Sequence, residues 1–211
     1  MSLDVKPLDK FGAEIAGIDI SQKLDASVAA AIRAAIDIHG VLVFRNAAPL
    51  SDSQQIAFAG GFGPLQHLSM IKMLGGGATR LDHTELIDVS NLDETGKIVG
   101  ADDRRRHFHD ANLLWHTDVS FDANRAVYSI LSARVLPPAG GDTDFADMRG
   151  AYAALTDKRK AELDGLEVEH SIWYSRALGG FTAVSEDEMA TRPPARHGLV
   201  SANPRTGTKA L

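Results

Sequence analysis

Apolar positions in the first part of the chain follow strand spacing and helix spacing in turn. Residues 13–20 are rich in apolar and β-branched side chains, which predicts a short strand. Asp25 suits the N-cap of a helix that Gly40 would close as its C-terminal glycine. The next apolar run, residues 41–44, has the length of a strand, and we expect it to be buried on both faces. The apolar residues that define the helix are Val28, Ile32, Ile36 and Ile38.

A second helix is predicted from Ser51 to the glycines near residue 60. Ser51 and Gln54 have the spacing of a capping box, in which each side chain bonds the backbone of the other residue. Residues 64–110 carry weaker signals: residues 75–77 are three glycines that indicate a flexible segment, and residues 85–90 have the composition of a strand. Residues 102–109 are densely charged. We therefore expect a mobile loop in this region.

The second half of the chain reads as short strands separated by glycine and proline turns. Strands are expected at 128–135, 143–146 and 166–173, with a short helix that Thr156 caps and that ends near Gly165. Together with the two earlier helices, this pattern predicts a single domain over residues 1–211. Its fold class is mainly β with flanking helices, an antiparallel barrel or jelly roll.

Composition removes several classes of function. The net charge of -6 gives no overall attraction to nucleic acid, and Arg104–Arg106 is the one basic run. No apolar run has the length of a membrane span, and no leader pattern precedes the first strand, so we expect a cytoplasmic protein with no membrane partner. Cysteine is absent, which excludes thiolate chemistry. A bound metal would therefore need nitrogen and oxygen ligands.

His116 and Asp118 are the strongest candidate for such a metal site. On a strand, residues two apart point to the same face, so one imidazole and one carboxylate could reach one ion. A second, distant histidine would complete the arrangement of two histidines and one carboxylate that holds non-haem Fe(II) and leaves positions open. A His-x-Asp triplet is common, however, and a surface histidine beside a turn aspartate is the ordinary interpretation of this triplet alone.

The surroundings of this triplet resemble the TauD/TfdA family of Fe(II)/2-oxoglutarate dioxygenases. The resemblance rests on four segments that occur in the family's order: residues 40–45 (GVLVFR), 62–65 (FGPL), 112–121 (NLLWHTDVSF) and 132–143 (SARVLPPAGGDT). It implies a double-stranded β-helix, that is, a jelly roll. It also implies Fe(II), 2-oxoglutarate as co-substrate, and O2.

The resemblance further implies roles for three residues. Thr143, 27 residues after His116, matches the threonine that binds the distal carboxylate of 2-oxoglutarate; the alternative is an ordinary strand threonine. Asn112 matches a position that lines the substrate pocket, against the alternative of a loop asparagine that bonds its own backbone. His67 matches a histidine that some relatives place against the substrate anion. The expected substrate is a small organic anion of the aryloxyalkanoate, sulfonate or sulfate type, which is hydroxylated with release of succinate and CO2.

Two other functions stay open on sequence grounds. A non-oxidative, cupin-like metal protein could use His107, His109 and His116 as a three-histidine site, although His107 and His109 lie in a charged segment expected to be a solvated loop. A catalytically degenerate or truncated homologue is the second alternative. The family resemblance itself implies a homo-oligomer, a dimer or higher. Trp115 and Tyr128 are expected to be core aromatics, His170 to be packed, and His197 to be an ordinary loop histidine.

Half of the implied iron site has no candidate in this sequence. The family pattern places a second histidine, followed by an arginine that pairs with 2-oxoglutarate, on the order of a hundred residues beyond the aspartate. Neither His170 nor His197 has that context, so we assign neither of them. Residues 209–211 look like the start of a strand that would be left unpaired. We therefore expect the sequence to lack a C-terminal part, without which the site would be incomplete.

Overall fold

The computed structural model describes residues 3–46, 48–67 and 80–211 of the chain. These residues form two compact units. Unit 1 consists of residues up to Leu65 together with 130–166 and 199–211, and unit 2 of residues 66–129 and 167–198. The predicted glycine segment 75–77 lies outside the described residues. No helix in the described part of the chain is long and apolar enough to cross a membrane.

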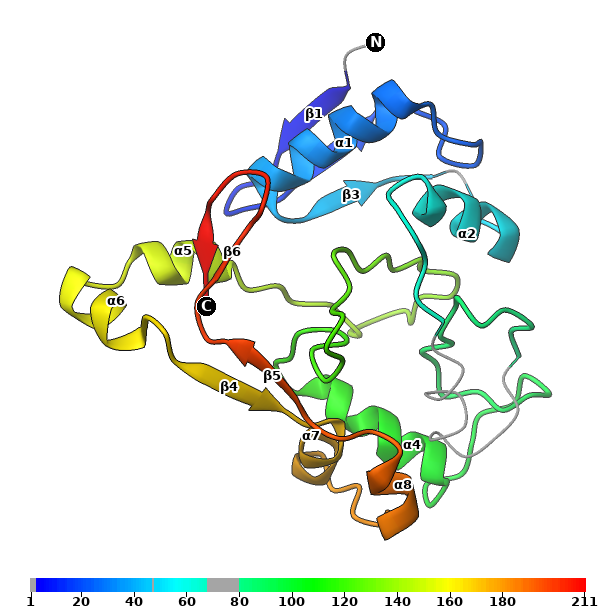
Figure 1. Ribbon diagram of the computed structural model, residues 1–211. Coiled ribbons are helices and arrows are strands. Elements are labelled where there is room, and N and C mark those ends of the chain that lie inside the picture. The colour runs from blue at the N-terminus through cyan, green and yellow to red at the C-terminus, as the bar shows by residue number, and fades with distance from the viewer. Residues whose placement is uncertain (1–2, 47, 68–79) are drawn as a thin grey trace. The chain divides into compact units, whose positions relative to one another are not determined.

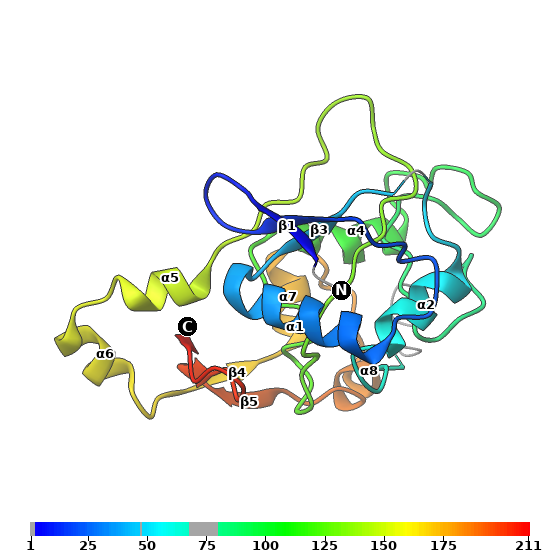
Figure 2. The same ribbon diagram turned by 90° about the horizontal axis from the view of Figure 1, so that it is seen from above.

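A three-stranded sheet with one covering helix forms the N-terminal part of unit 1. Strand β1 (Asp4–Pro7) pairs antiparallel with β2 (Ala13–Ala16), and β2 pairs parallel with β3 (Leu42–Phe44). The connection between the two parallel strands is α1 (Ala26–His39), which lies over one face of the sheet (Figures 1 and 2). The predicted helix and both strands are thus confirmed, with shorter strands. Strand β3 is only half-buried, however, so the expectation of burial on both faces was wrong.

Local capping signals define the helices of unit 1. Helix α1 ends at Gly40, whose φ of 76° is a conformation that L side chains rarely adopt. Helix α2 (Asp52–Gly60) has the predicted capping box: Gln54 N donates to Ser51 Oγ at 3.3 Å and Ser51 N donates to Gln54 Oε1 at 2.9 Å. Thr156 caps α6 (Asp157–Leu163), as expected, after α5 (Met148–Ala153).

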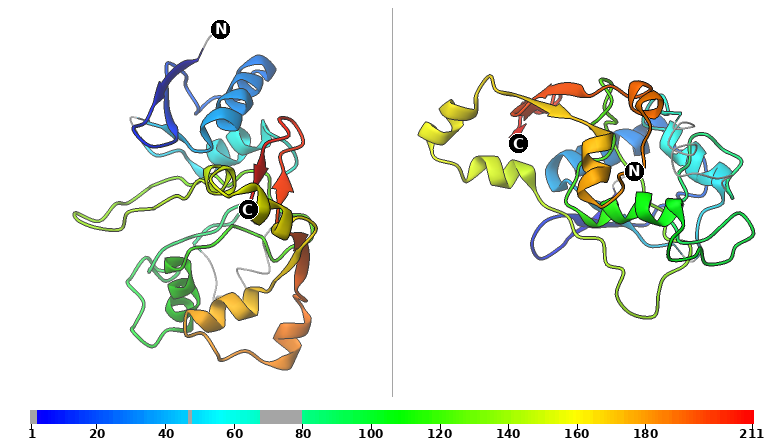
Figure 3. Two further views of the ribbon diagram at one scale, coloured as in Figure 1. Left: turned by 90° about the vertical axis from the view of Figure 1, so that its left-hand side faces the viewer. Right: turned by 90° about the horizontal axis from the view of Figure 1, so that it is seen from below.

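The last strand of the chain is paired, against expectation. Strand β6 (Ser201–Ala202) and β7 (Lys209–Ala210) form an antiparallel hairpin beside α5 (Figure 3). Asp37 near the end of α1 connects this hairpin to the helix, because its carboxylate accepts bonds from Asn203 at 3.0 Å and from Arg205. Arg149 of α5 donates to the Asp37 carbonyl at 2.9 Å. These contacts join the two ends of unit 1.

Unit 2 combines short helices with one two-stranded sheet. The helices among its described residues are α4 (Arg104–Asp110), the 3-10 helix η1 (Ala111–Leu113), α7 (Ile172–Leu178) and α8 (Glu186–Ala190). Strand β4 (Glu167–His170) pairs antiparallel with β5 (Ala195–Gly198). The buried core of the unit consists of Phe108, Ile172, Trp173 and Phe181.

Several predicted elements differ from this structure. The charged segment 102–109, expected to be a loop, contains α4, because Asp103 caps it and Phe108 is buried in the core. The predicted strand 166–173 ends at residue 170, where α7 follows. Residues 85–90, 128–135 and 143–146 are not strands. The described chain is thus a set of small sheets with flanking helices.

The core of unit 1 generates a prediction about stability. Phe58 is 3% exposed and packs edge-on against Phe44 and Phe62, with ring centroids 5.5 and 5.3 Å away. Replacing Phe58 by alanine should lower the free energy of unfolding by about 3 kcal/mol or more, because it removes apolar burial and leaves a cavity. Phe145, which is 50% exposed, is the control: F145A should cost about 1 kcal/mol or less. Urea unfolding measures both, and equal losses would contradict the assigned core.

Candidate metal centre

His116 and Asp118 form a pair of facing donor atoms in unit 2. The His116 Nε2 atom lies 3.4 Å from Asp118 Oδ1, and the two side chains are 41% and 48% exposed. The other ring nitrogen, Nδ1, lies 2.6 Å from the carbonyl oxygen of Leu114. A carbonyl can only accept, so Nδ1 carries a hydrogen and Nε2 is the ring nitrogen that faces the carboxylate.

This arrangement suits a cation between the two side chains. Two lone pairs that face each other at 3.4 Å repel unless a proton or a metal ion lies between them. A histidine that ligates a metal usually donates its other N–H to a carbonyl or carboxylate, as His116 does to Leu114. The predicted proximity is therefore present, but its cause differs from the prediction. Residues 115–117 are not a strand, and a turn begins at Asp118.

A three-histidine alternative is not assembled. Within the described residues, no group of three or more histidine, cysteine, aspartate or glutamate side chains could hold a metal ion. His107 lies on the exposed side of α4, 3.9 Å from Asp110. His109 is largely buried beside the Phe108 ring, and burial lowers its pKa. A metal at His116 and Asp118 thus has two protein ligands among the described residues.

The aromatic neighbour of this pair is exposed. Trp115 is 72% exposed and Leu113 is 87% exposed, so the expectation that Trp115 is a core aromatic was wrong. Tyr128 is half-buried. The pair therefore lies at a surface of unit 2 that carries apolar side chains.

Asn112 is bound to a partly buried arginine. Its Oδ1 accepts a hydrogen bond from Arg176 Nη1 at 2.8 Å, and the same nitrogen donates to the Phe108 carbonyl at 3.0 Å. The Arg176 guanidinium also lies 4.3 Å from the centroid of the Phe108 ring, and burial lowers its pKa. Asn112 is therefore not a loop asparagine that bonds its own backbone through this oxygen. Its amide nitrogen is the atom that a substrate role would use.

Thr143 lies in unit 1, in an exposed stretch without regular structure. The two glycines before it turn the chain sharply, as predicted: φ is 71° at Gly140 and 75° at Gly141. A Cβ atom on Gly141 would lie 2.9 Å from the Pro137 side chain, so no larger residue fits without a shift. Thr143 belongs to unit 1 and His116 to unit 2.

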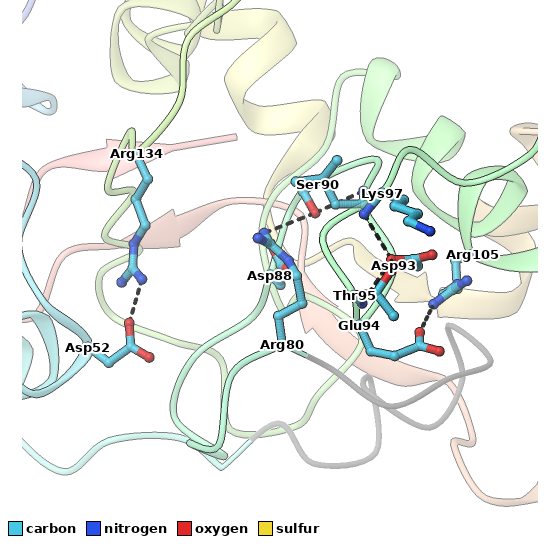
Figure 4. A network of polar contacts seen from close by, with 11 residues as sticks. Asp52, Arg80, Asp88, Ser90, Asp93, Glu94, Thr95, Lys97, Arg105 and Arg134 are labelled. Atoms are coloured by element: carbon cyan, nitrogen blue, oxygen red, sulfur yellow. Dashed lines mark hydrogen bonds and ion pairs between the residues drawn. The ribbon is translucent and has the colours of Figure 1, made fainter.

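Ion pairs and turn contacts connect residues between 80 and 105, which are part of the segment expected to be a mobile loop. Arg80 donates to both carboxylate oxygens of Asp88, at 2.9 and 3.0 Å, and Arg105 pairs with Glu94 at 2.9 Å (Figure 4). Arg105 also bonds the Asp103 side chain and lowers the pKa of that carboxyl to about 2. In unit 1, Arg134 pairs with Asp52.

His67 is connected to the same region of unit 2. Its Nδ1 atom lies 2.9 Å from the hydroxyl of Thr84, which in turn donates to Glu85 at 3.3 Å. The imidazole is exposed, so it remains accessible to a ligand.

Long-range contacts reach the turn after Asp118, and the sequence analysis missed them. His197 Nε2 lies 2.8 Å from the carbonyl oxygen of Ser120, and Arg192 pairs with Asp122 at 3.3 Å. His197 was expected to be an ordinary loop histidine, but it belongs to β5. A pattern along the chain does not reveal such contacts, because more than 65 residues separate the partners in sequence.

Comparisons with known proteins agree with the predicted resemblance. The family model for "Taurine catabolism dioxygenase TauD, TfdA family" matches residues 4–211. The chain is 42% identical over 212 residues to an alpha-ketoglutarate-dependent 2,4-dichlorophenoxyacetate dioxygenase of Cupriavidus pinatubonensis, an alignment that covers 100% of this chain and 73% of that protein. It is 32% identical over 219 residues to an (S)-phenoxypropionate/alpha-ketoglutarate-dioxygenase of Sphingobium herbicidovorans, with 100% and 70% covered.

A solved structure is similar over the whole chain. The crystal structure of AAD-2 in complex with Mn(II) and N-oxalylglycine superposes with a TM-score of 0.91 at 39% sequence identity. The superposition covers 100% of this chain and 73% of that one.

The contact between Asn112 and Arg176 generates a second prediction. Replacing Asn112 by alanine should lower the free energy of unfolding by about 1.5 kcal/mol, because a partly buried guanidinium loses a charge-assisted acceptor. In an R176M background the same substitution should cost much less, because the partner is absent. Urea unfolding of the four proteins gives the coupling energy. A cost for N112A that is the same in both backgrounds would contradict the pairing.

Proposed function

The chain belongs to the TauD/TfdA family of 2-oxoglutarate-dependent dioxygenases, and from this premise we propose the substrate and the residues that bind it, the co-substrate and the metal. The substrate is a small organic anion, which is hydroxylated while 2-oxoglutarate and O2 yield succinate and CO2. Relatives named as aryloxyalkanoate dioxygenases support an aryloxyalkanoate as the first choice. A relative named alkylsulfatase and another named as a sulfate ester dioxygenase make a sulfate ester the second.

We infer that His116 and Asp118 supply two of the three protein ligands to Fe(II). The supporting observation is the facing of Nε2 and Oδ1 at 3.4 Å, with the Nε2 lone pair directed to the carboxylate by the bond from Nδ1 to Leu114. When bound, Fe(II) would activate O2 and polarise the keto acid. The chain's own part is to hold one neutral nitrogen donor and one anionic oxygen donor and to leave the other positions open. The third ligand is not assigned to any residue.

Thr143 is the proposed partner of the distal carboxylate of 2-oxoglutarate. Its hydroxyl is exposed, and the turn at Gly140 and Gly141 directs the chain into the stretch that carries it. A hydroxyl that donates to a carboxylate forms a charge-assisted bond. The proposed fold is the double-stranded β-helix, and the proposed assembly is a homo-oligomer, both by analogy with the family.

Asn112 and His67 are the proposed contacts to the substrate anion. Asn112 keeps its amide N–H groups for this role, because its oxygen is bound to Arg176. The Arg176 contact would then orient the amide, so that the same pair serves stability and recognition. His67 presents an exposed imidazole whose Nδ1 is bound to Thr84.

The direct test is substrate-stimulated succinate formation. The protein, expressed from its complete reading frame, is incubated with Fe(II), ascorbate, 2-oxoglutarate and a panel of aryloxyalkanoates, alkyl sulfates and sulfonates. Replacing His116 by alanine should lower turnover by at least 1000-fold, because the proposed nitrogen ligand, oriented by its bond to Leu114, is lost. H83A in the same unit is the control and should retain activity. Full turnover in H116A would refute this site. Metal binding without any turnover would favour the non-oxidative alternative.

The proposed role of Thr143 is tested by measuring the KM for 2-oxoglutarate. T143V should raise the KM for 2-oxoglutarate about tenfold, the equivalent of one hydrogen bond, and should change kcat much less. T206V, at an exposed threonine of the β6–β7 turn, is the matched control and should leave that KM unchanged. Initial rates at saturating substrate and varied 2-oxoglutarate give both constants. An unchanged KM in T143V would remove Thr143 from the proposed site.

A further inference from the structure

The residue after Asp118 has a strained backbone. Val119 has φ 54°, and it is the one non-glycine residue with positive φ in the part of the chain that the structure describes. The left-handed region is costly for any L residue and most of all for a β-branched one, because Cβ approaches the neighbouring carbonyl. Such a conformation persists only where the surroundings determine it. Contacts elsewhere in unit 2 must therefore hold this turn.

Each of the three residues after Val119 has such a contact. The Ser120 carbonyl accepts the bond from His197 Nε2 at 2.8 Å. Phe121 packs against the buried core around Phe108. Asp122 pairs with Arg192 at 3.3 Å, and its backbone N–H closes the turn on the Val119 carbonyl at 3.1 Å.

The two polar contacts come from one stretch of chain, which follows α8 and includes β5. His197 lies in β5, opposite Val168 of β4, and its ring contacts the His170 ring edge-on with centroids 5.4 Å apart. Arg192 follows α8, and its side chain is 22% exposed. This stretch is attached to α7, because the Trp173 ring nitrogen donates a hydrogen bond to the Met189 carbonyl of α8 at 3.3 Å. A donor on a paired strand can hold its acceptor in one place.

We propose that His197 and Arg192 are positioning residues for the carboxylate of Asp118. They hold residues 120–122 on one side of Val119, while buried Ala111 and the bond from Arg176 to Asn112 hold the chain before His116. If Val119 relaxed to negative φ with both sides held, the dihedrals of residues 116–118 would have to change in compensation, and these dihedrals set the distance between Asp118 and His116. The proposal rests on the proposed function, in which His116 and Asp118 bind the metal.

The test measures binding of Mn(II) to the complete protein, with no turnover required. H197F keeps an aromatic ring against His170 but removes the donor to Ser120, and it should weaken Mn(II) binding about tenfold. H197Q keeps an N–H donor and should restore binding to within about threefold of the unsubstituted protein. R192M should weaken binding in the same direction. R196M is the matched control for R192M. Arg196 lies on β5 beside His197 and forms an ion pair whose side chains are 72% and 54% exposed, so its loss should leave Mn(II) binding unchanged.

A double-mutant test with Val119 distinguishes a positioning role of His197 from a merely structural one. V119G removes the cost of positive φ, so H197F should weaken Mn(II) binding less than threefold in the V119G background. Equal effects of H197F in both backgrounds, or unchanged Mn(II) affinity in H197F, would overturn the proposal. If H197F does not fold, the effect of R192M on Mn(II) binding is compared with and without V119G instead, and equal effects would overturn the proposal. H116A separates the two claims: unchanged affinity there overturns the metal assignment and with it this proposal, whereas lost affinity leaves the positioning role to the other variants.

Discussion

The hydrogen bond between His116 Nδ1 and the Leu114 carbonyl is the contact on which the candidate site depends. It determines which ring nitrogen keeps a lone pair, and it aims that lone pair at Asp118 Oδ1, 3.4 Å away. Without this bond the exposed imidazole would rotate and could take either tautomer. With it, a neutral nitrogen and an anionic oxygen face one point, as a divalent cation requires. The backbone between Leu114 and Asp118 thus prepares the pair, although it is not the strand that period-two spacing suggested.

The parts of the fold that could be predicted are those with local causes. Gly40 ends α1, the Ser51 and Gln54 side chains begin α2, and Thr156 begins α6, because each signal acts within about four residues. The predicted strands at 128–135 and 143–146 have suitable residues, but a strand exists only when a neighbouring strand takes up its hydrogen bonds. Composition does not show whether that neighbour is present. The same reason explains why segment 102–109 was misread: its charges suggested a loop, while the burial of Phe108 made it a helix.

The candidate site could likewise be predicted only in part. The spacing of His116 and Asp118 predicted that the two side chains face each other, as they do in the structure, and the motifs around them pointed to the family that the comparisons confirm. What surrounds the pair could not be foreseen. Arg176 binds Asn112 across 64 residues of sequence, and His197 reaches Ser120 across 77. Such contacts depend on how β5 and α7 are packed within unit 2, which no short motif encodes.

The orientation of two candidate ligands two residues apart therefore depends on the tertiary structure around them. On a strand, two such side chains would share a face, but residues 115–117 are not a strand, and the turn that follows them passes through a valine in the left-handed region. That conformation is unfavourable by itself, so residues of β5 and its approach must hold it. A His-x-Asp triplet without such support would relax into two ordinary surface side chains. In the proposed site, this support, more than the triplet, separates a metal-binding pair from a chance occurrence of the same three residues.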